Sequence, residues 1–285
     1  MRYSATSVML PDLDIVEQAA LLQRLGYDGI EWRVRRVSEG ARGKGFSPWG
    51  EHKNDLSPEN FAAQAGKMKQ VAADHGLAIA GIASAPSADD LEQIKLLVAG
   101  AAACGAPFVR VGCPRLYNGT VNYHVLYQEA VDAYGKALEL AAGSGVKLCM
   151  EIHGGTIHVS ASLAYRIVSN FPADRMCVIY DPQNMVADGY ETTELGIELL
   201  DQYIGHCHVG GHKPVEKGRD ETGSMQWEWP GCAMADGLYS FPRMLKKLKA
   251  VGYAHFISVE DFRDMPHEAK LRENIDYLRG VEAKV

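Results

Sequence analysis

The sequence has none of the features that mark export, membrane insertion or a disulfide scaffold. No stretch approaches the run of about 18 apolar residues that a bilayer span needs, and the opening segment MRYSATSVMLPDLD has no long apolar core. The six cysteines form no C-x-x-C pair, and Cys149, Cys177 and Cys207 lie in apolar runs, where a free thiol packs as a small hydrophobic group. We therefore expect reduced thiols, a cytoplasmic location and no membrane association.

Positive charge is also scarce. Lys and Arg number 29 against 36 Asp and Glu, which gives a formal net charge of −7. The cluster Lys246, Lys247 and Lys249 falls in a helical pattern typical of a solvated helix face. A protein that binds duplex DNA usually carries a basic patch or stripe, so we expect no nucleic-acid partner.

Short apolar runs alternate with amphipathic stretches along the whole chain, which predicts strands and helices in strict alternation. Such alternation indicates a parallel sheet with helices outside, and eight units in 285 residues fit a single (β/α)₈ barrel domain spanning 1–285. An open doubly wound sheet is the alternative, but it favours a Gly-rich phosphate turn after the first strand, and MLPDLD supplies none. The expected strands are 3–9, 29–33, 78–83, 108–111, 147–152, 176–180, 204–209 and 256–260.

Turn and cap residues set the expected helix boundaries. Asp12 is the expected N-cap of the first helix and Gly26 its stop, Pro58 opens the second, and Ser87 with Asp90 resembles a capping box for the third. The remaining helices are expected at 122–142, 160–170, 193–200, 240–250 and 267–279. Two insertions, 34–56 and 210–237, follow the second and seventh strands. Because active sites of such barrels lie at the C-terminal ends of the strands, we expect both insertions to wall or cover the site.

Four strand-like segments of the second half end in residues that bind metal ions. Glu151 ends KLCME, Asp181 follows CVIY, His208 lies in HCHV and Glu260 ends FISVE. Glu151 and Asp181 are separated by about one βα unit, and so are Asp181 and His208. This spacing places the residues at the same level of consecutive units. Carboxylates gathered at one rim repel each other unless a cation or proton lies between them. We therefore predict one divalent metal ion, and three carboxylates with one imidazole suit Mn²⁺, Mg²⁺, Co²⁺ or Zn²⁺.

Each of these residues has an ordinary structural explanation as well. Asp181 precedes Pro182 and is suited to cap the following helix, and Glu260 with Asp261 is suited to the same role. His206 shares the strand face of His208 and is expected to be buried in the core or to support a ligand. The common topological level of the four residues favours the metal site over four separate coincidences.

The segments MEIHGG, YDPQNM, HCHV and ISVEDF resemble the xylose isomerase-like TIM-barrel superfamily of sugar isomerases and epimerases, and the resemblance runs from GYDGIEW to HFISVEDF. It implies that Glu151, Asp181, His208 and Glu260 bind one divalent metal. It also implies that Glu151 and Glu260 are the catalytic groups that move a proton on a carbon next to a carbonyl, through an enediolate that a metal stabilises.

The resemblance leaves the reaction open. A sugar or keto-sugar isomerase or epimerase is the first expectation, and a metal-dependent lyase or dehydratase of a keto-inositol or 3-keto-glycoside is the alternative. An abasic-site endonuclease would need a basic surface, which the acidic composition lacks. Ketose 3-epimerases have a histidine and a further glutamate where this chain has Asn184 and Ile157, which argues against a plain ketohexose epimerase.

Several other polar residues are candidates for binding a small carbohydrate substrate. Arg110 is a charge inside an apolar strand, so it is expected to pair with an interior carboxylate, Glu31 or Glu151. The sequence leaves open whether the chain forms a homo-oligomer. The candidate substrate-binding residues are Glu31, Arg33, Arg110, His153, Asn184 and His212.

Overall fold

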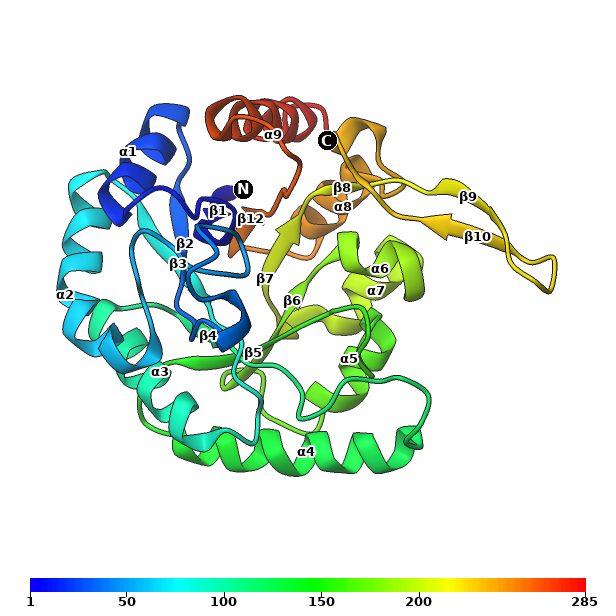
Figure 1. Ribbon diagram of the computed structural model, residues 1–285, viewed down its shortest axis with the longest axis horizontal. Coiled ribbons are helices and arrows are strands. Elements are labelled where there is room, and N and C mark those ends of the chain that lie inside the picture. The colour runs from blue at the N-terminus through cyan, green and yellow to red at the C-terminus, as the bar shows by residue number, and fades with distance from the viewer.

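The computed structural model describes all 285 residues and shows a closed barrel of parallel strands surrounded by helices (Figure 1). The predicted (β/α)₈ barrel is confirmed, and the open sheet is ruled out because β1 pairs with both β2 and β12. Around the barrel the strands follow the order β1-β12-β7-β6-β5-β4-β3-β2. They are β1 Arg2–Thr6, β2 Gly29–Arg33, β3 Ala78–Ala83, β4 Phe108–Arg110, β5 Lys147–Glu151, β6 Met176–Tyr180, β7 Ile204–Val209 and β12 Phe256–Val259.

Nine α-helices surround this barrel, and none has the length and hydrophobicity needed to cross a bilayer. The helix between β6 and β7 is split into two short helices. The helices are α1 Ile15–Leu25, α2 Pro58–Asp74, α3 Leu91–Cys104, α4 Tyr123–Leu140, α5 Ala161–Val168, α6 Pro182–Asp188, α7 Thr193–Leu200, α8 Phe241–Ala250 and α9 His267–Glu282.

Two of the expected helix starts were wrong by a few residues. Helix α1 is capped by Asp14 and not by Asp12, because Asp14 accepts from the backbone N–H of Glu17 while the Glu17 carboxylate accepts from the Asp14 N–H. Helix α3 is capped by Asp90 alone, whose carboxylate accepts from the Gln93 N–H. The first strand is also shorter than expected, since the chain turns into a 3₁₀ helix at Ser7–Met9.

An aromatic ring and three smaller side chains form an apolar cluster inside the barrel. Phe108 packs against Cys149, Cys177 and Ile179, all fully buried or nearly so. Gly81 leaves room for this ring, because a Cβ at that position would lie 2.1 Å from Phe108 Cζ. This apolar cluster therefore lies inside the barrel, below the polar residues at its C-terminal rim.

The insertion after β2 lies over the rim, as expected. Arg33 donates from Nη2 to the Gly50 carbonyl at 2.8 Å, and the Trp49 ring lies 5.0 Å from Phe262, in the loop after β12. These contacts hold residues 34–56 beside the end of β12.

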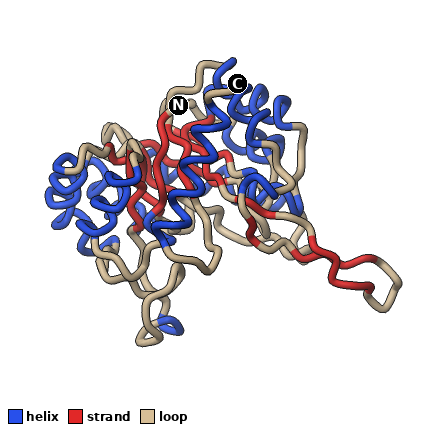
Figure 2. Tube along the Cα trace, turned by 90° about the horizontal axis from the view of Figure 1, so that it is seen from above, coloured by secondary structure: helices blue, strands red, loops and turns tan.

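The insertion after β7 behaves differently from the expectation. Its base, β8 Gly211–His212 paired with β11 Gly231–Cys232, stays at the rim. Its outer part is a hairpin of β9 Val215–Arg219 and β10 Met225–Glu228, which projects away from the barrel (Figures 1 and 2). The prediction that the whole insertion covers the site was therefore wrong for this hairpin, because its side chains are mostly exposed on both faces and give it no apolar surface to fold back with.

Candidate metal centre and active site

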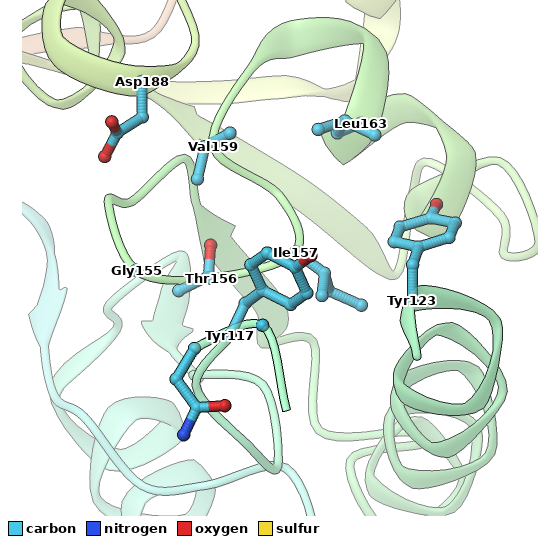
Figure 3. Close-up of a pocket in the computed structure, with 10 residues that line it drawn as sticks. Tyr117, Tyr123, Gly155, Thr156, Ile157, Val159, Leu163 and Asp188 are labelled. Atoms are coloured by element: carbon cyan, nitrogen blue, oxygen red, sulfur yellow. The ribbon is translucent and has the colours of Figure 1, made fainter. Parts of the chain in front are cut away.

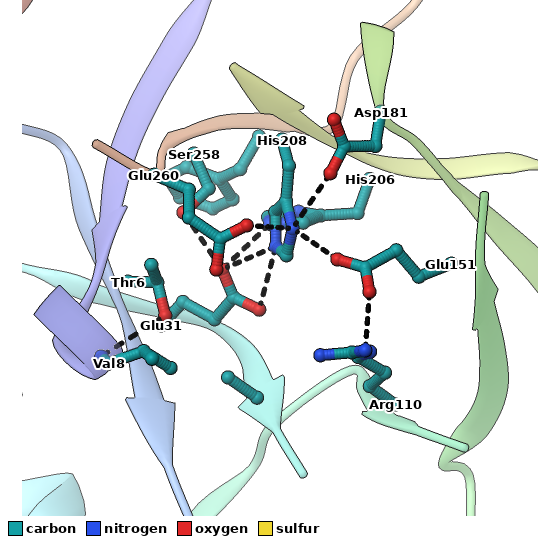
Figure 4. Close-up of polar contacts among 12 residues, drawn as sticks. Thr6, Val8, Glu31, Arg110, Glu151, Asp181, His206, His208, Ser258 and Glu260 are labelled. Carbon is teal, nitrogen blue, oxygen red and sulfur yellow. Dashed lines mark hydrogen bonds and ion pairs between the residues drawn. The ribbon is translucent and has the colours of Figure 1, made fainter. Parts of the chain in front are cut away.

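The four predicted metal ligands meet at the C-terminal rim of the barrel (Figure 4). Glu151 is the last residue of β5, Asp181 directly follows β6, His208 lies in β7 and Glu260 directly follows β12. One ligand atom from each lies within 4.8 Å of all the others, and every one of these residues is buried. Residues separated by up to 109 positions are thus brought together by the shared direction of the parallel strands.

The two nitrogens of His208 face different partners. Nδ1 lies 2.8 Å from Glu151 Oε1, 3.3 Å from Glu260 Oε2 and 3.9 Å from Asp181 Oδ2. Nε2 lies 3.0 and 3.1 Å from the two oxygens of Glu31. A carboxylate that accepts from one ring N–H fixes the tautomer and orientation of a ligating histidine. Glu31 accordingly holds the ring so that Nδ1 faces the carboxylate cluster, where its lone pair would be available to a cation that replaces the proton.

Glu31 is itself held rigidly beneath the site. It is fully buried, accepts from the Ser258 hydroxyl at 2.8 Å and lies 3.3 Å from His206 Nε2. Burial alone would raise the pKa of Glu31, but His208 and His206 outweigh it and keep that pKa well below its ordinary value. His206 is the buried supporting residue that the sequence indicated, with its second nitrogen unpaired.

Asp181 divides its two oxygens between two functions. Oδ1 accepts from the backbone N–H groups of Gln183 and Asn184 at 2.9 and 3.1 Å and so caps α6. Oδ2 points toward His208 and accepts from the Asn184 side-chain amide at 2.6 Å. The neighbouring Gln183 donates to Glu260 Oε2 at 3.3 Å. The first turn of α6 therefore positions two of the three carboxylates.

The electrostatics of the cluster fit a divalent cation. Burial and the nearby Glu151 raise the pKa of Asp181 well above its ordinary value. Burial would also raise the pKa of Glu151, but Arg110 and His208 lower it to about 2. Buried like charges at this spacing are costly without a compensating positive charge. Three carboxylate oxygens and one imidazole nitrogen form a donor set suited to Mg²⁺, Mn²⁺, Co²⁺ or Zn²⁺.

The two glutamates open into two separate cavities at the rim. Glu151 lines a cavity of about 230 Å³ together with Arg110, His153, Thr156 and His158, between the ends of β3, β4 and β5. Glu260 lines a cavity of about 240 Å³ on the opposite half of the rim, together with residues from the ends of β6, β7 and β12. The second cavity also contains Gln183, His212, Asp261 and Arg263.

The six predicted substrate-binding residues lie in four different settings. His153 and His212 line the two cavities, with the His153 Nδ1 2.7 Å from the Gly154 carbonyl. Arg110 contacts Glu151 Oε2 at 2.5 Å, which confirms its predicted pairing with an interior carboxylate. Arg33 instead binds the backbone of the insertion after β2, and burial lowers its pKa to about 10. Glu31 and Asn184 contact the cluster itself, as described above.

His158 and Gln183 were missed in the sequence. His158 is 2% exposed and lines the Glu151 cavity, and neither ring nitrogen has a hydrogen-bond partner. Burial and the neighbouring His153 lower its pKa to about 4, so the ring is neutral at pH 7. No periodic pattern marks His158, because it lies in the irregular loop between β5 and α5. Gln183 lies inside the segment YDPQNM, where the adjacent Asp181 and Asn184 drew the prediction.

The protein is a (β/α)₈ barrel, and the C-terminal rim of the barrel carries a cluster of residues of the types that bind metal ions. The chain belongs to the xylose isomerase-like TIM barrel family, whose model matches residues 19–281. A search of curated proteins finds no significant match to the sequence.

Solved structures share the fold along nearly the whole chain at low sequence identity. The apo form of 3-keto-D-glucoside 4-epimerase from E. coli is 13% identical, covers 98% of this chain and 99% of its own, and has a TM-score of 0.71. D-Psicose 3-epimerase from Clostridium cellulolyticum H10, solved with D-tagatose, is 13% identical, covers 99% of each chain and has a TM-score of 0.72. A xylose isomerase-like TIM barrel protein from Mycobacterium smegmatis, in complex with magnesium, is 16% identical and has a TM-score of 0.69. The match covers 99% of this chain and 97% of that protein's chain.

Proposed function

We propose that this protein is a divalent-metal-dependent isomerase or epimerase of a sugar or keto-sugar. The observation that carries the proposal is the arrangement of the two glutamates. Glu151 and Glu260 both lie within 3.3 Å of His208 Nδ1, yet each opens into its own cavity on opposite halves of the rim. A substrate between them would present a different face to each carboxylate.

The residues of the chain divide the work of moving a proton next to a carbonyl. Arg110 keeps Glu151 ionised, so this carboxylate is ready to accept a proton from a substrate carbon. Gln183 holds Glu260 on the other side, where it exchanges a proton with the opposite face of the same carbon or with its neighbour. A divalent cation bound by Glu151, Asp181, His208 and Glu260 supplies Lewis-acid stabilisation of the negative charge that develops on the substrate oxygens.

Neutral polar groups around the cavities are suited to sugar hydroxyls. The uncharged ring of His158 has a donor and an acceptor without partners, and burial also lowers the pKa of His212 in the other cavity. His153 lines the same cavity as His158. Hydroxyl groups both donate and accept, so neutral imidazoles match them better than a row of fixed charges would.

Similar folds support this class of reaction without fixing the substrate. Two of the matching structures are, by their names, a 3-keto-glucoside epimerase and a psicose epimerase, and a third contains magnesium. A lyase that acts on a 3-keto-glycoside would begin with the same proton removal and would then expel a leaving group. The two reactions are distinguished by their products.

The test is solvent proton exchange in D₂O, with candidate keto-sugars and the metal-loaded protein, followed by NMR. We expect Glu151→Gln and Glu260→Gln each to reduce exchange by at least about 100-fold while circular dichroism shows a folded barrel. Glu92→Gln, on the exposed side of α3, is the matched control and should exchange normally.

Exchange without loss of a leaving group supports an isomerase or epimerase, and exchange coupled to loss of one supports the lyase. Full activity in either glutamate variant would refute the assigned roles. A protein that binds no divalent metal by elemental analysis would refute the proposal as a whole.

A further inference from the structure

A second, larger groove lies on the same rim as the Glu151 cavity. It has a volume of about 630 Å³ and is bounded by the loop before α4, the loop before α5, and the nearby ends of α5 and α6 (Figure 3). Its lining residues are Tyr117, Asn118, Gly119, Tyr123, Gly155, Thr156, Ile157, Val159, Leu163 and Asp188.

The groove adjoins the proposed catalytic cavity. Thr156 lines both spaces, and the adjacent residues Leu116 and Tyr117 line one space each. The two loops that separate the spaces are joined by a hydrogen bond from the Tyr117 N–H to the Gly155 carbonyl, 2.8 Å long. A molecule bound beside Glu151 would therefore reach the groove by passing over Thr156, which borders both spaces.

The lining favours a neutral, flat and largely apolar group. Tyr117 and Tyr123 offer aromatic faces, and Ile157 and Leu163 offer aliphatic surface. No Lys or Arg lines the groove, and the one charged residue there, Asp188, would repel an anion such as a phosphate. Flat rings gain both hydrophobic and quadrupole energy from such aromatic walls.

We infer that the substrate is a keto-glycoside whose oxidised sugar ring binds beside Glu151 and whose aromatic aglycone occupies this groove. The inference rests on the proposed function for the position of the sugar ring. It also accounts for apolar surface left open on this rim: Tyr117 in the groove is 47% exposed, and the adjacent Leu116 in the Glu151 cavity is 72% exposed.

The test compares phenyl β-D-glucoside with methyl β-D-glucoside, measured by titration calorimetry on the metal-loaded protein. Wild-type protein should bind the phenyl compound about tenfold more tightly, because the contact between aromatic rings adds to the free energy gained by burying the phenyl group. Tyr117→Ala should remove most of that preference, and Tyr117→Phe should keep it. Trp227→Ala removes an exposed aromatic side chain on the β9–β10 hairpin and should leave the preference unchanged.

Equal affinity for the two glucosides in the wild-type protein would overturn the inference. A preference for the phenyl compound that survives Tyr117→Ala would also overturn it. If that variant instead changes its oligomeric state and keeps the preference, the groove is an interface between copies of the chain and the inference is wrong. Neither glucoside has a carbonyl, so binding does not depend on proton exchange. A phenyl preference without exchange on any keto-sugar would contradict the proposed function alone.

Discussion

Replacing Glu31 by glutamine tests whether the buried carboxylate beneath His208 controls metal binding. Glutamine keeps the shape of the side chain and an oxygen that accepts from the His208 Nε2–H, but it removes the charge that polarises the ring. Outer partners of ligating histidines typically account for 10- to 100-fold in metal affinity. We expect a loss of about 30-fold, which corresponds to about 2 kcal/mol.

The magnitude translates into a thermal shift. At a metal concentration about 100 times the wild-type Kd, binding stabilises the folded protein by about 2.7 kcal/mol, and a 30-fold weaker site leaves about 0.9 kcal/mol. With an unfolding entropy of roughly 2.1 cal/mol/K per residue, or about 0.6 kcal/mol/K for 285 residues, the metal should raise Tm by about 4–5 °C in the wild-type protein and by about 1.5 °C in Glu31→Gln.

The assay is a thermal melt of each protein after EDTA treatment, with and without added Mn²⁺. The change caused by the metal is compared within each protein, so the direct effect of the mutation on folding cancels. Glu92→Gln on the surface should show the full wild-type shift. If Glu31→Gln also keeps the full shift, Glu31 does not orient the ring, and the assignment of His208 Nδ1 as a ligand loses its support.

Two further predictions concern stability. Burial, together with Arg33, lowers the pKa of His52 to about 3, so below its unfolded pKa of about 6.5 the unfolded chain binds a proton that the folded chain does not. Between pH 8 and pH 5 the wild-type protein should therefore lose about 2 kcal/mol more of its free energy of unfolding than His52→Gln does. This difference corresponds to about 3 °C in Tm. Profiles of Tm against pH that run parallel in the two proteins would contradict the prediction. Gly81→Ala should destabilise the barrel by about 1–3 kcal/mol in urea melts because its Cβ overlaps the Phe108 ring, whereas Gly66→Ala, exposed in α2 with open space around it, should stabilise it by up to about 1 kcal/mol. Equal effects would show that Phe108 moves aside.

Much of the fold could be predicted because the apolar runs are short and sharply bounded. The bounds of β6 and β7 agree with the expectation residue for residue, since each run ends at a polar ligand or a glycine. The cap of α1 could also have been found: Asp14 precedes Glu17 by three residues, which is the spacing of a capping box, whereas Asp12 has no such partner.

The sequence predicts the four metal-ligand candidates, but it does not predict which residues support them. Parity along each strand places His206 and His208 on one face, but it does not say that Glu31, some 175 residues away, lies across the barrel from them. The sequence also does not predict where the β9–β10 hairpin lies. The length of the insertion shows that extra chain is present, but strands with polar residues on both faces do not indicate whether the hairpin packs on the barrel or projects from it.

Asp181 shows why structural and functional explanations of one residue need not compete. In the sequence, a helix cap and a metal ligand are alternatives for this position, yet the carboxylate has two oxygens and each serves one purpose. The two backbone N–H groups at Oδ1 do not compensate for the surroundings of Oδ2, because burial and the adjacent Glu151 and Glu260 still raise the pKa of Asp181 well above its ordinary value. A helix cap alone therefore leaves this buried carboxylate unstable in its charged form. A divalent cation shared with Glu151 and Glu260 removes that imbalance, so the same geometry that caps α6 also favours metal binding.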